Sequence, residues 1–173
     1  MSDKPGAGFA EHTLQYLPRL RRYARALTGD TAAADELVQD TLERALNKQA
    51  LWREGSDLRA WLFTVMHNVF VNQIRSAAVT RTVPVDDALL DSPAAASSDR
   101  LELRDLDRAL QLLPEEQREV VLLVGLEELT YEEAAVVLEV PVGTIMSRLS
   151  RGRERLRRIL SGSGGSPALK VIK

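Results

Sequence analysis

The side chains best suited to chemistry gather near the end of the chain, where residues 148–158 contain six arginines and one acidic residue. At 100° per residue, Ile145, Leu149 and Leu156 share one side of a helix. The opposite side is polar and mostly cationic, and it carries Ser147, Ser150, Arg151, Glu154 and Arg158. A guanidinium group there can donate paired hydrogen bonds to a base edge or bind a phosphate. The pattern alone also fits a solvated helix of a helical hairpin, but it favours a helix that binds DNA.

The residues before this cationic helix predict a second, shorter helix and a tight turn. Thr130 is followed three residues later by Glu133, which is a capping-box pattern. The next apolar residues fall on one helical face: Tyr131, Ala134, Ala135 and Leu138. Residues 140–143 interrupt the pattern, and Pro141 suits the first turn of a new helix. A short helix, a turn and an arginine-rich helix are typical of a helix-turn-helix, whose second helix enters the major groove.

Charge distribution supports contact with a specific DNA site. The formal net charge is −2, and the stretch 115–139 is mainly acidic, so the basic residues of 148–158 form a local face. A local basic face on a near-neutral chain suits site-specific contact better than general coating of DNA.

Composition excludes several other classes. There are no cysteines, so disulfides, thiolate metal sites and a thiol redox switch within the chain are excluded. His12 and His67 are far apart and form no motif, and no phosphate loop or HExxH motif is present. We therefore expect no metal, no cofactor and no enzymatic activity. No apolar run approaches the length of a membrane span, and no signal-type apolar segment opens the chain, so we expect a cytoplasmic protein.

Apolar periodicity predicts an all-α chain with two small helical domains. The first spans residues 10–77 and the second, which contains the helix-turn-helix, spans residues 101–160. Residues 78–100 hold two prolines, an Ala/Ser run and four aspartates, so we expect a flexible linker. Residues 161–173 are expected to form a flexible tail.

Two helices of the first domain carry polar faces. The helix predicted over 34–47 turns Val38 and Leu42 inward, and its outer side bears Asp35, Glu36, Gln39, Asp40 and Glu43. That side fits a solvated surface, or a basic partner helix. The helix predicted over 58–76 is capped by Ser56 and buries Leu58, Trp61, Leu62, Val65 and Val69. Its other side exposes Thr64, His67, Asn68, Val71 and Arg75.

Four strings in order resemble the extracytoplasmic-function (ECF) group of bacterial sigma factors. They are DELVQDTLERAL, LRAWLFTVMHNVFVNQIR, LPEEQREVVLL and TYEEAAVVLEVPVGTIMSRLSRGRERL. The resemblance covers roughly residues 14–160 and is interrupted only at the expected linker. Parts of 47–61 resemble the alphaproteobacterial general-stress subgroup. The resemblance implies a sigma factor that binds core RNA polymerase and promoter DNA in a stress or envelope response, and that is inhibited by an anti-sigma factor.

The resemblance also implies roles for particular residues. Docking on core polymerase would use Asp35, Glu36, Gln39, Asp40 and Glu43. Capture of the melted −10 element would use Trp52, Arg53, Asn68, Asn72 and Arg75. Aromatic side chains can stack on unpaired bases, and amides can pair with exposed base edges. Reading of the −35 element would use Thr144, Ser147, Arg148, Arg151 and Arg155.

Four positions depart from the family pattern. Asn72 stands in place of the usual Asp, and Glu139 in place of a turn glycine. Met146 replaces Arg or Lys, which puts one expected DNA contact in doubt. Gly152 replaces Ala, and we expect it to weaken its helix by about 1 kcal/mol.

Two other classes of protein remain open. One is a stand-alone helix-turn-helix regulator, which would need dimer contacts and a palindromic operator. Such a protein leaves the Trp52–Asn72 region unexplained. The other is a sigma-like mimic that sequesters an anti-sigma factor and never touches DNA. Loss of basic residues would favour the mimic, and only Met146 points that way.

Overall fold

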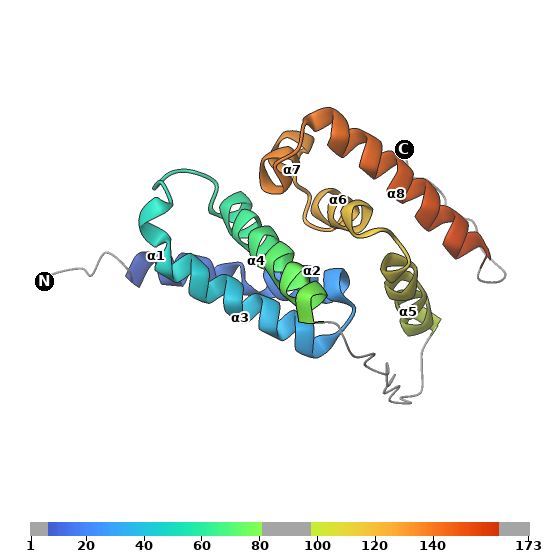
Figure 1. The fold of residues 1–173 in the computed structure, drawn as a ribbon, viewed down its shortest axis with the longest axis horizontal. Helices are drawn as coiled ribbons and strands as arrows, with labels where there is room; N and C mark the ends of the chain where they lie inside the picture. The colour runs from blue at the N-terminus through green and yellow to red at the C-terminus, as the bar shows by residue number, and fades with distance from the viewer. Residues whose placement is uncertain (1–6, 81–97, 163–173) are drawn as a thin grey trace, which may run out of the picture.

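The computed structural model describes residues 7–80 and 98–162, and every regular element in those ranges is helical (Figure 1). The elements are α1 (Ala7–Gln15), α2 (Leu17–Thr28), α3 (Thr31–Asn47), the 3-10 turn η1 (Gln49–Leu51), α4 (Leu58–Thr80), α5 (Ser98–Gln111), α6 (Glu115–Gly125), α7 (Tyr131–Leu138) and α8 (Val142–Gly162). The predicted all-α fold with two helical domains is confirmed. Most of the predicted linker and tail, residues 81–97 and 163–173, lies outside the described residues.

The first helical stretch is broken into two helices. Residues 14–27 have one helical spacing, but α1 ends at Gln15 and α2 begins at Leu17. Pro18 lies in the first turn of α2. Backbone N–H groups in the first turn have no partner within the helix, so the missing N–H of proline costs no hydrogen bond there. Leu14 therefore belongs to α1 and is 57% exposed, outside the register of α2. Helix α1 starts at Ala7, within the stretch expected to be frayed.

Side-chain caps fix the starts of α3 and α4. Asp30 accepts a hydrogen bond from the backbone N–H of Ala33 at 2.8 Å, as the sequence allowed. The predicted cap of α4, Ser56, is wrong. Asp57 Oδ1 accepts from the backbone N–H of Ala60 at 3.2 Å, whereas Ser56 Oγ donates to the carbonyl of Arg53 at 2.7 Å.

Helix α4 is the central element of the molecule, since it packs on α3 and also on α7 (Figure 1). The predicted inward residues Leu58, Leu62, Val65 and Val69 are buried, and Trp61 is partly buried. The sequence did not predict that Phe63, Met66 and Phe70 are buried as well. A single amphipathic face, as the sequence predicted, would explain the packing of α4 on only one of its two neighbours, α3 and α7. Because α4 is covered on two sides, its apolar residues extend round the helix.

We call α1–α4 the first unit and α5–α8 the second unit. The second unit has the predicted helix-turn-helix in α7 and α8, packed on α6. The capping box is present: Thr130 Oγ1 accepts from the N–H of Glu133 at 3.1 Å, and Glu133 Oε2 accepts from the N–H of Thr130 at 2.7 Å. Pro141 immediately precedes α8, which starts at Val142. Ile145 and Leu149 are buried beneath α8.

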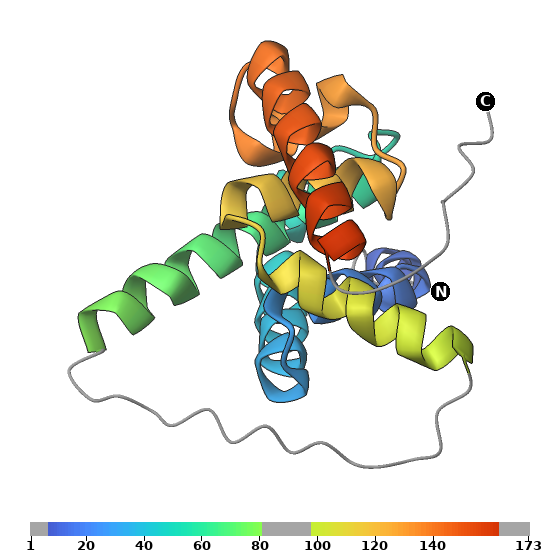
Figure 2. The ribbon, with the colours of Figure 1, turned by 90° about the vertical axis from the view of Figure 1, so that its right-hand side faces the viewer.

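The two helical units pack directly on one another. Helix α4 packs on α7, and α2 contacts both α5 and α6 (Figures 1 and 2). The side chain of Glu127 is fully buried between the units and faces Arg19 Nε at 3.1 Å and Arg22 Nη2 at 2.9 Å. His67 Nδ1 lies 2.7 Å from Glu119 Oε1, and Arg59 Nη2 lies 3.3 Å from Glu133 Oε1. Polar groups therefore join the units at several points.

Candidate nucleic-acid interface and docking groove

The outer face of α8 is the strongest candidate for binding a nucleic acid. Its buried side is formed by Ile145, Leu149 and Gly152, which pack towards the rest of the second unit. The side chains turned to solvent are Met146, Ser150, Arg151, Arg153, Glu154, Arg155, Arg157 and Arg158. We call this set the outer face of α8. In Figure 2, α8 is the helix of its unit that lies in front of α6 and α7.

The arginines of this helix differ in how free they are. Arg148, 22% exposed in its side chain, is held by Glu116 Oε2 of α6 at 3.1 Å. Arg157 and Arg158 both pair with Glu154, at 2.6 and 3.2 Å. Within residues 7–80 and 98–162, no ion pair or side-chain hydrogen bond engages Arg151, Arg153 or Arg155. These three guanidinium groups are therefore available to bases or phosphates.

The five residues predicted to read DNA from this helix fall into three environments. Arg151 and Arg155 are exposed and unpaired in the described part of the chain. Thr144 and Ser147 are half-buried, and Ser147 Oγ donates to the carbonyl of Thr144 at 3.1 Å. Arg148 is turned back against α6. Sequence reasoning overlooked Arg153, whose exposure the helical register could have indicated.

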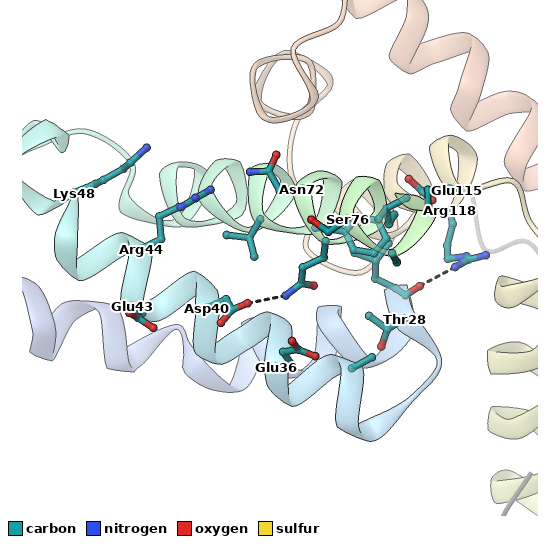
Figure 3. Close-up of a pocket in the computed structure, with 18 of the residues that line it drawn as sticks. Thr28, Glu36, Asp40, Glu43, Arg44, Lys48, Asn72, Ser76, Glu115 and Arg118 are labelled. Atoms are coloured by element: carbon teal, nitrogen blue, oxygen red, sulfur yellow. Dashed lines mark hydrogen bonds between the residues drawn. The ribbon is translucent and has the colours of Figure 1, made fainter. Parts of the chain in front are cut away.

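A groove between α3 and α4 is the second candidate site (Figure 3). Its volume is about 1330 Å³, and it is lined by Glu36, Asp40 and Glu43 from α3 and by Asn72 and Gln73 from α4. Asp40 Oδ2 accepts from Gln73 Nε2 at 2.8 Å. We call it the α3–α4 groove. The wall on the α3 side also carries Arg44 and Lys48, so its acidic part, at Glu36, Asp40 and Glu43, is the part that suits a basic segment of a partner protein.

One predicted −10 residue, Asn72, shares a groove with the predicted docking residues. Three of the five predicted docking residues line the α3–α4 groove, while Asp35 and Gln39 are exposed on α3 outside it. Asn72, predicted to bind DNA, lines the same groove from the opposite wall. Arg75 is exposed on α4, three residues after Asn72.

The second unit closes one end of the α3–α4 groove. Glu115 and Arg118 of α6 line it beside Thr28 (Figure 3). Burial raises the pKa of the Glu115 carboxyl, with Glu119 adding to the shift, and burial lowers the pKa of the Arg118 guanidinium. Arg118 Nη1 donates to the carbonyl of Leu27 at 2.8 Å, so this end of the groove is fixed by a bond between the units.

The remaining predicted −10 residues lie outside the α3–α4 groove, two of them in the segment between η1 and α4. Trp52 is half-buried and packs on Phe9, with ring centroids 5.5 Å apart, and it lines a second hollow of about 960 Å³ with Ser56. Arg53 is exposed beside it, and Asn68 is exposed midway along α4 and lines neither hollow. The structure therefore places two of the five residues in the segment before α4 and three along α4, instead of gathering them in one pocket.

Two other kinds of site are absent from the described part of the chain. Among the described residues, no cluster of three or more His, Cys, Asp or Glu side chains could hold a metal ion. No helix in the described ranges is both long and apolar enough to cross a membrane.

Known proteins share both units in the same order. A family model described as the Sigma2 domain of PhyR matches residues 14–67, and one described as Sigma-70, region 4, matches residues 103–156. The ECF RNA polymerase sigma factor EcfG of Rhodopseudomonas palustris is 39% identical over 158 residues, which are 87% of this chain and 84% of that protein. The ECF sigma factor SigM of Mycobacterium tuberculosis is 31% identical over 82% of this chain and 71% of its own length.

Solved structures share the fold. The sigma factor RpoE from Bartonella quintana, in complex with the anti-sigma factor NepR, is similar with a TM-score of 0.76 and 37% identity. The match covers 91% of this chain and 99% of that one. CnrH, in complex with the cytosolic domain of CnrY, matches in fold with a TM-score of 0.68 at 24% identity.

Proposed function

Because this chain belongs to the ECF subfamily of sigma-70-type RNA polymerase sigma factors, we propose that its two helical units divide core docking, −10 capture and −35 reading between them. It is an alternative sigma factor that directs transcription from particular promoters. The observation that carries the proposal is the ordered match of both units together with the unpaired arginines on α8. The chain acts without catalysing a reaction itself, and it acts in the cytoplasm.

Core RNA polymerase docks on α3. The exposed outer side of α3 is acidic at Asp35, Glu36 and Glu43, and Asp40 completes it within the α3–α4 groove. A helix with this face attracts a basic helix of the partner, and charge complementarity raises the association rate and fixes the register.

The first unit captures the melted −10 strand along α4. Asn68 offers an exposed amide that can pair with an unstacked base edge, Arg53 is an exposed cation in the segment before α4, and Arg75 is an exposed cation in the C-terminal half of α4. Trp52 is half-buried against Phe9, so its role is to form one wall of the hollow beside Arg53.

The outer face of α8 reads the −35 element. Arg151 and Arg155 contact bases or phosphates. Thr144 and Ser147 lie at the N-terminal end of α8, the end that enters the major groove of the DNA. Arg148 joins them only after its ion pair with Glu116 is exchanged for a contact with DNA. Phosphate contacts position the helix, and base contacts specify the sequence.

An anti-sigma factor is the regulatory partner, as RpoE of Bartonella quintana has NepR. Helix α5 offers a surface for it. Leu101 and Leu103 are 52% and 61% exposed, and Leu106 beside them is 36% exposed. An amphipathic helix with its apolar residues in water is suited to a partner helix.

One observation favours the alternative of a sigma-like mimic that sequesters an anti-sigma factor. The family model that matches residues 14–67 is described as the Sigma2 domain of PhyR. A PhyR of Bartonella quintana is described as an anti-anti-sigma factor, although its 18% identity to this chain shows only the fold. The arginines of α8 oppose this alternative, because a protein that never touches DNA has no use for three unpaired guanidinium groups on one helix.

Reconstituted transcription tests the proposal. The full chain is mixed with core RNA polymerase and a library of genomic promoters, and start sites are mapped. We expect specific starts that are absent with core enzyme alone. Arg151→Ala should lose sensitivity to −35 substitutions and keep the −10 preferences, whereas Asn68→Ala should do the reverse. Arg108→Ala, which removes an exposed arginine of α5 that lies 3.9 Å from Asp105, is the matched control. No starts above core enzyme, with tight binding of an anti-sigma factor, would establish the mimic.

A further inference from the structure

Met146 is an exposed apolar side chain on a helix whose other exposed residues are polar. It is 54% exposed, whereas its neighbours Ile145 and Leu149 are 0% and 2% exposed. The core of the second unit is thus complete without it. Single exposed apolar residues are common on protein surfaces, so what matters is where Met146 lies on the outer face of α8 and what its side chain can contact there.

The surroundings of Met146 let its side chain project furthest on its side of the helix. Gly143 lies one turn before it and Ser150 one turn after it, and both are small. A Cβ added at Gly143 would meet nothing within 4 Å, so the space beside this turn is open. Helical side chains lean towards the N-terminus. Met146 therefore extends over the first turn of α8, which is the part of a recognition helix that reaches base edges.

The chemistry of methionine restricts what it can distinguish there. Its thioether has no donor and is only a weak acceptor, so it cannot read the hydrogen-bonding groups of a base pair. In the major groove, one base feature is apolar, the C5-methyl group of thymine. The flexible and polarizable side chain of methionine packs readily on such a group.

We propose that Met146 is a specificity-determining residue that selects a thymine at one position of the −35 element by contact with its methyl group. This inference rests on the proposed function of α8 as the −35 reader. An arginine or lysine at the same place would select a guanine through O6 and N7. Methionine in place of arginine or lysine then changes which base is selected, while the side chain at position 146 still contacts a base.

Thymine-to-uracil exchange tests the contact, since it removes the methyl group and keeps every hydrogen-bonding group. The preferred −35 duplex is first selected from randomised DNA with the full chain and core polymerase. Each thymine is then replaced in turn by uracil. We expect one replacement to weaken binding about four-fold, which corresponds to one buried methyl-sized group.

Variants link that loss to Met146. Met146→Ala should bind thymine and uracil duplexes equally, Met146→Leu should keep the discrimination, and selection with Met146→Arg should return guanine at the same position. Val136→Ala, at an apolar side chain of α7 that is 69% exposed, is the matched control and should behave as the parent.

Two results overturn the inference while leaving the proposed function intact. The first is a chain that gives promoter-specific starts but whose binding is weakened by no thymine-to-uracil replacement. The second is a replacement that weakens binding of Met146→Ala as much as binding of the parent. A chain that selects no duplex and produces no starts overturns both.

Discussion

At the scale of single residues, two departures from the family pattern have different physical meanings. Gly152 is buried where α8 crosses α6, and a Cβ there would lie 2.8 Å from Val121 Cγ2. The expectation that Gly152 merely weakens its helix is therefore incomplete, because the close approach of two helices excludes a larger residue. Glu139, by contrast, ends α7 with φ 54°, a left-handed conformation in which glycine carries no steric penalty.

Gly152→Ala should lower the free energy of unfolding by about 1 kcal/mol, since overpacking outweighs the gain in helix propensity. Val121 is β-branched and has few rotamers with which to move aside. Urea denaturation gives the free energy. Combining Gly152→Ala with Val121→Ala should cost less than the sum of the two single changes. A single Gly152→Ala variant that is more stable than the parent would show that helix propensity decides this position.

Glu139→Gly should raise the free energy of unfolding by about 1 kcal/mol, because a non-glycine residue pays a steric cost in the left-handed region. Thermal unfolding followed by circular dichroism measures the change. Glu132→Gly is the matched control, since Glu132 is exposed inside α7 and glycine there should destabilise by about 1 kcal/mol. Equal effects at both positions would contradict the argument.

At the scale of elements, Arg118 of α6 fixes the end of α5. Its guanidinium donates to the carbonyls of Leu110, Gln111 and Leu113 at 2.9 to 3.0 Å, at and just beyond the C-terminal end of the helix. The same group reaches Leu27 at the end of α2. One side chain therefore joins three helices, and its planar fork of donors makes this possible.

Arg118→Ala should lower the free energy of unfolding by about 2 kcal/mol, since several carbonyls lose a charged donor. Arg118→Lys should restore less than half, because a single ammonium group cannot span these acceptors. Hydrogen exchange of α5 should quicken in both variants. Arg108→Ala, at an exposed arginine that lies 3.9 Å from Asp105, is the control and should have an effect near zero. Full recovery with lysine would mean that charge alone matters.

At the scale of the whole molecule, a buried acid holds the two units together. Glu127 is fully buried, with Oε1 accepting from Arg22 Nη2 at 2.9 Å. Arg19 Nε lies 3.1 Å from Oε2, but its alignment is too poor for a hydrogen bond. The acid comes from one unit and both arginines come from the other. This arrangement also places Glu115 and Arg118 at the end of the α3–α4 groove, where a docking partner would meet them.

Glu127→Gln should loosen the contact between the units, because two cations then face a neutral amide. We expect the free energy of unfolding to fall by about 2 kcal/mol and the radius of gyration from small-angle scattering to increase. Glu128→Gln changes the neighbouring, exposed acid and serves as the control. An unchanged radius of gyration together with unchanged stability would show that apolar packing alone holds the units.

Tyr23 gives the packed arrangement a signature at high pH. Burial raises the pKa of its hydroxyl well above 10.0, and Glu119 and Glu127 of the other unit add to the shift. The folded state thus keeps the proton that the unfolded chain releases near pH 10. Stability should therefore be constant up to that pH and fall as pH rises through the folded pKa. Urea denaturation between pH 8 and 11 should show a shallower fall in Tyr23→Phe than in the parent.

The sequence by itself determined the local structure and the family of this protein. The capping box at Thr130, the periodicity of α3 and α8 and the arginines of 148–158 are encoded within a few residues of one another. Helix periods and caps depend on such short separations, so they can be predicted from the chain alone. The ordered motifs indicated the ECF group in the same way.

Only the tertiary structure decided which polar groups are free and which are paired. Arg148 and Arg151 look alike in sequence, but Glu116, far away along the chain, engages only Arg148. His67, expected to face solvent, meets Glu119 of the other unit. Gly152 is required because α6 crosses α8 at that point. Each of these outcomes depends on the approach of elements distant in sequence, and no pattern confined to one helix contains the partner's position.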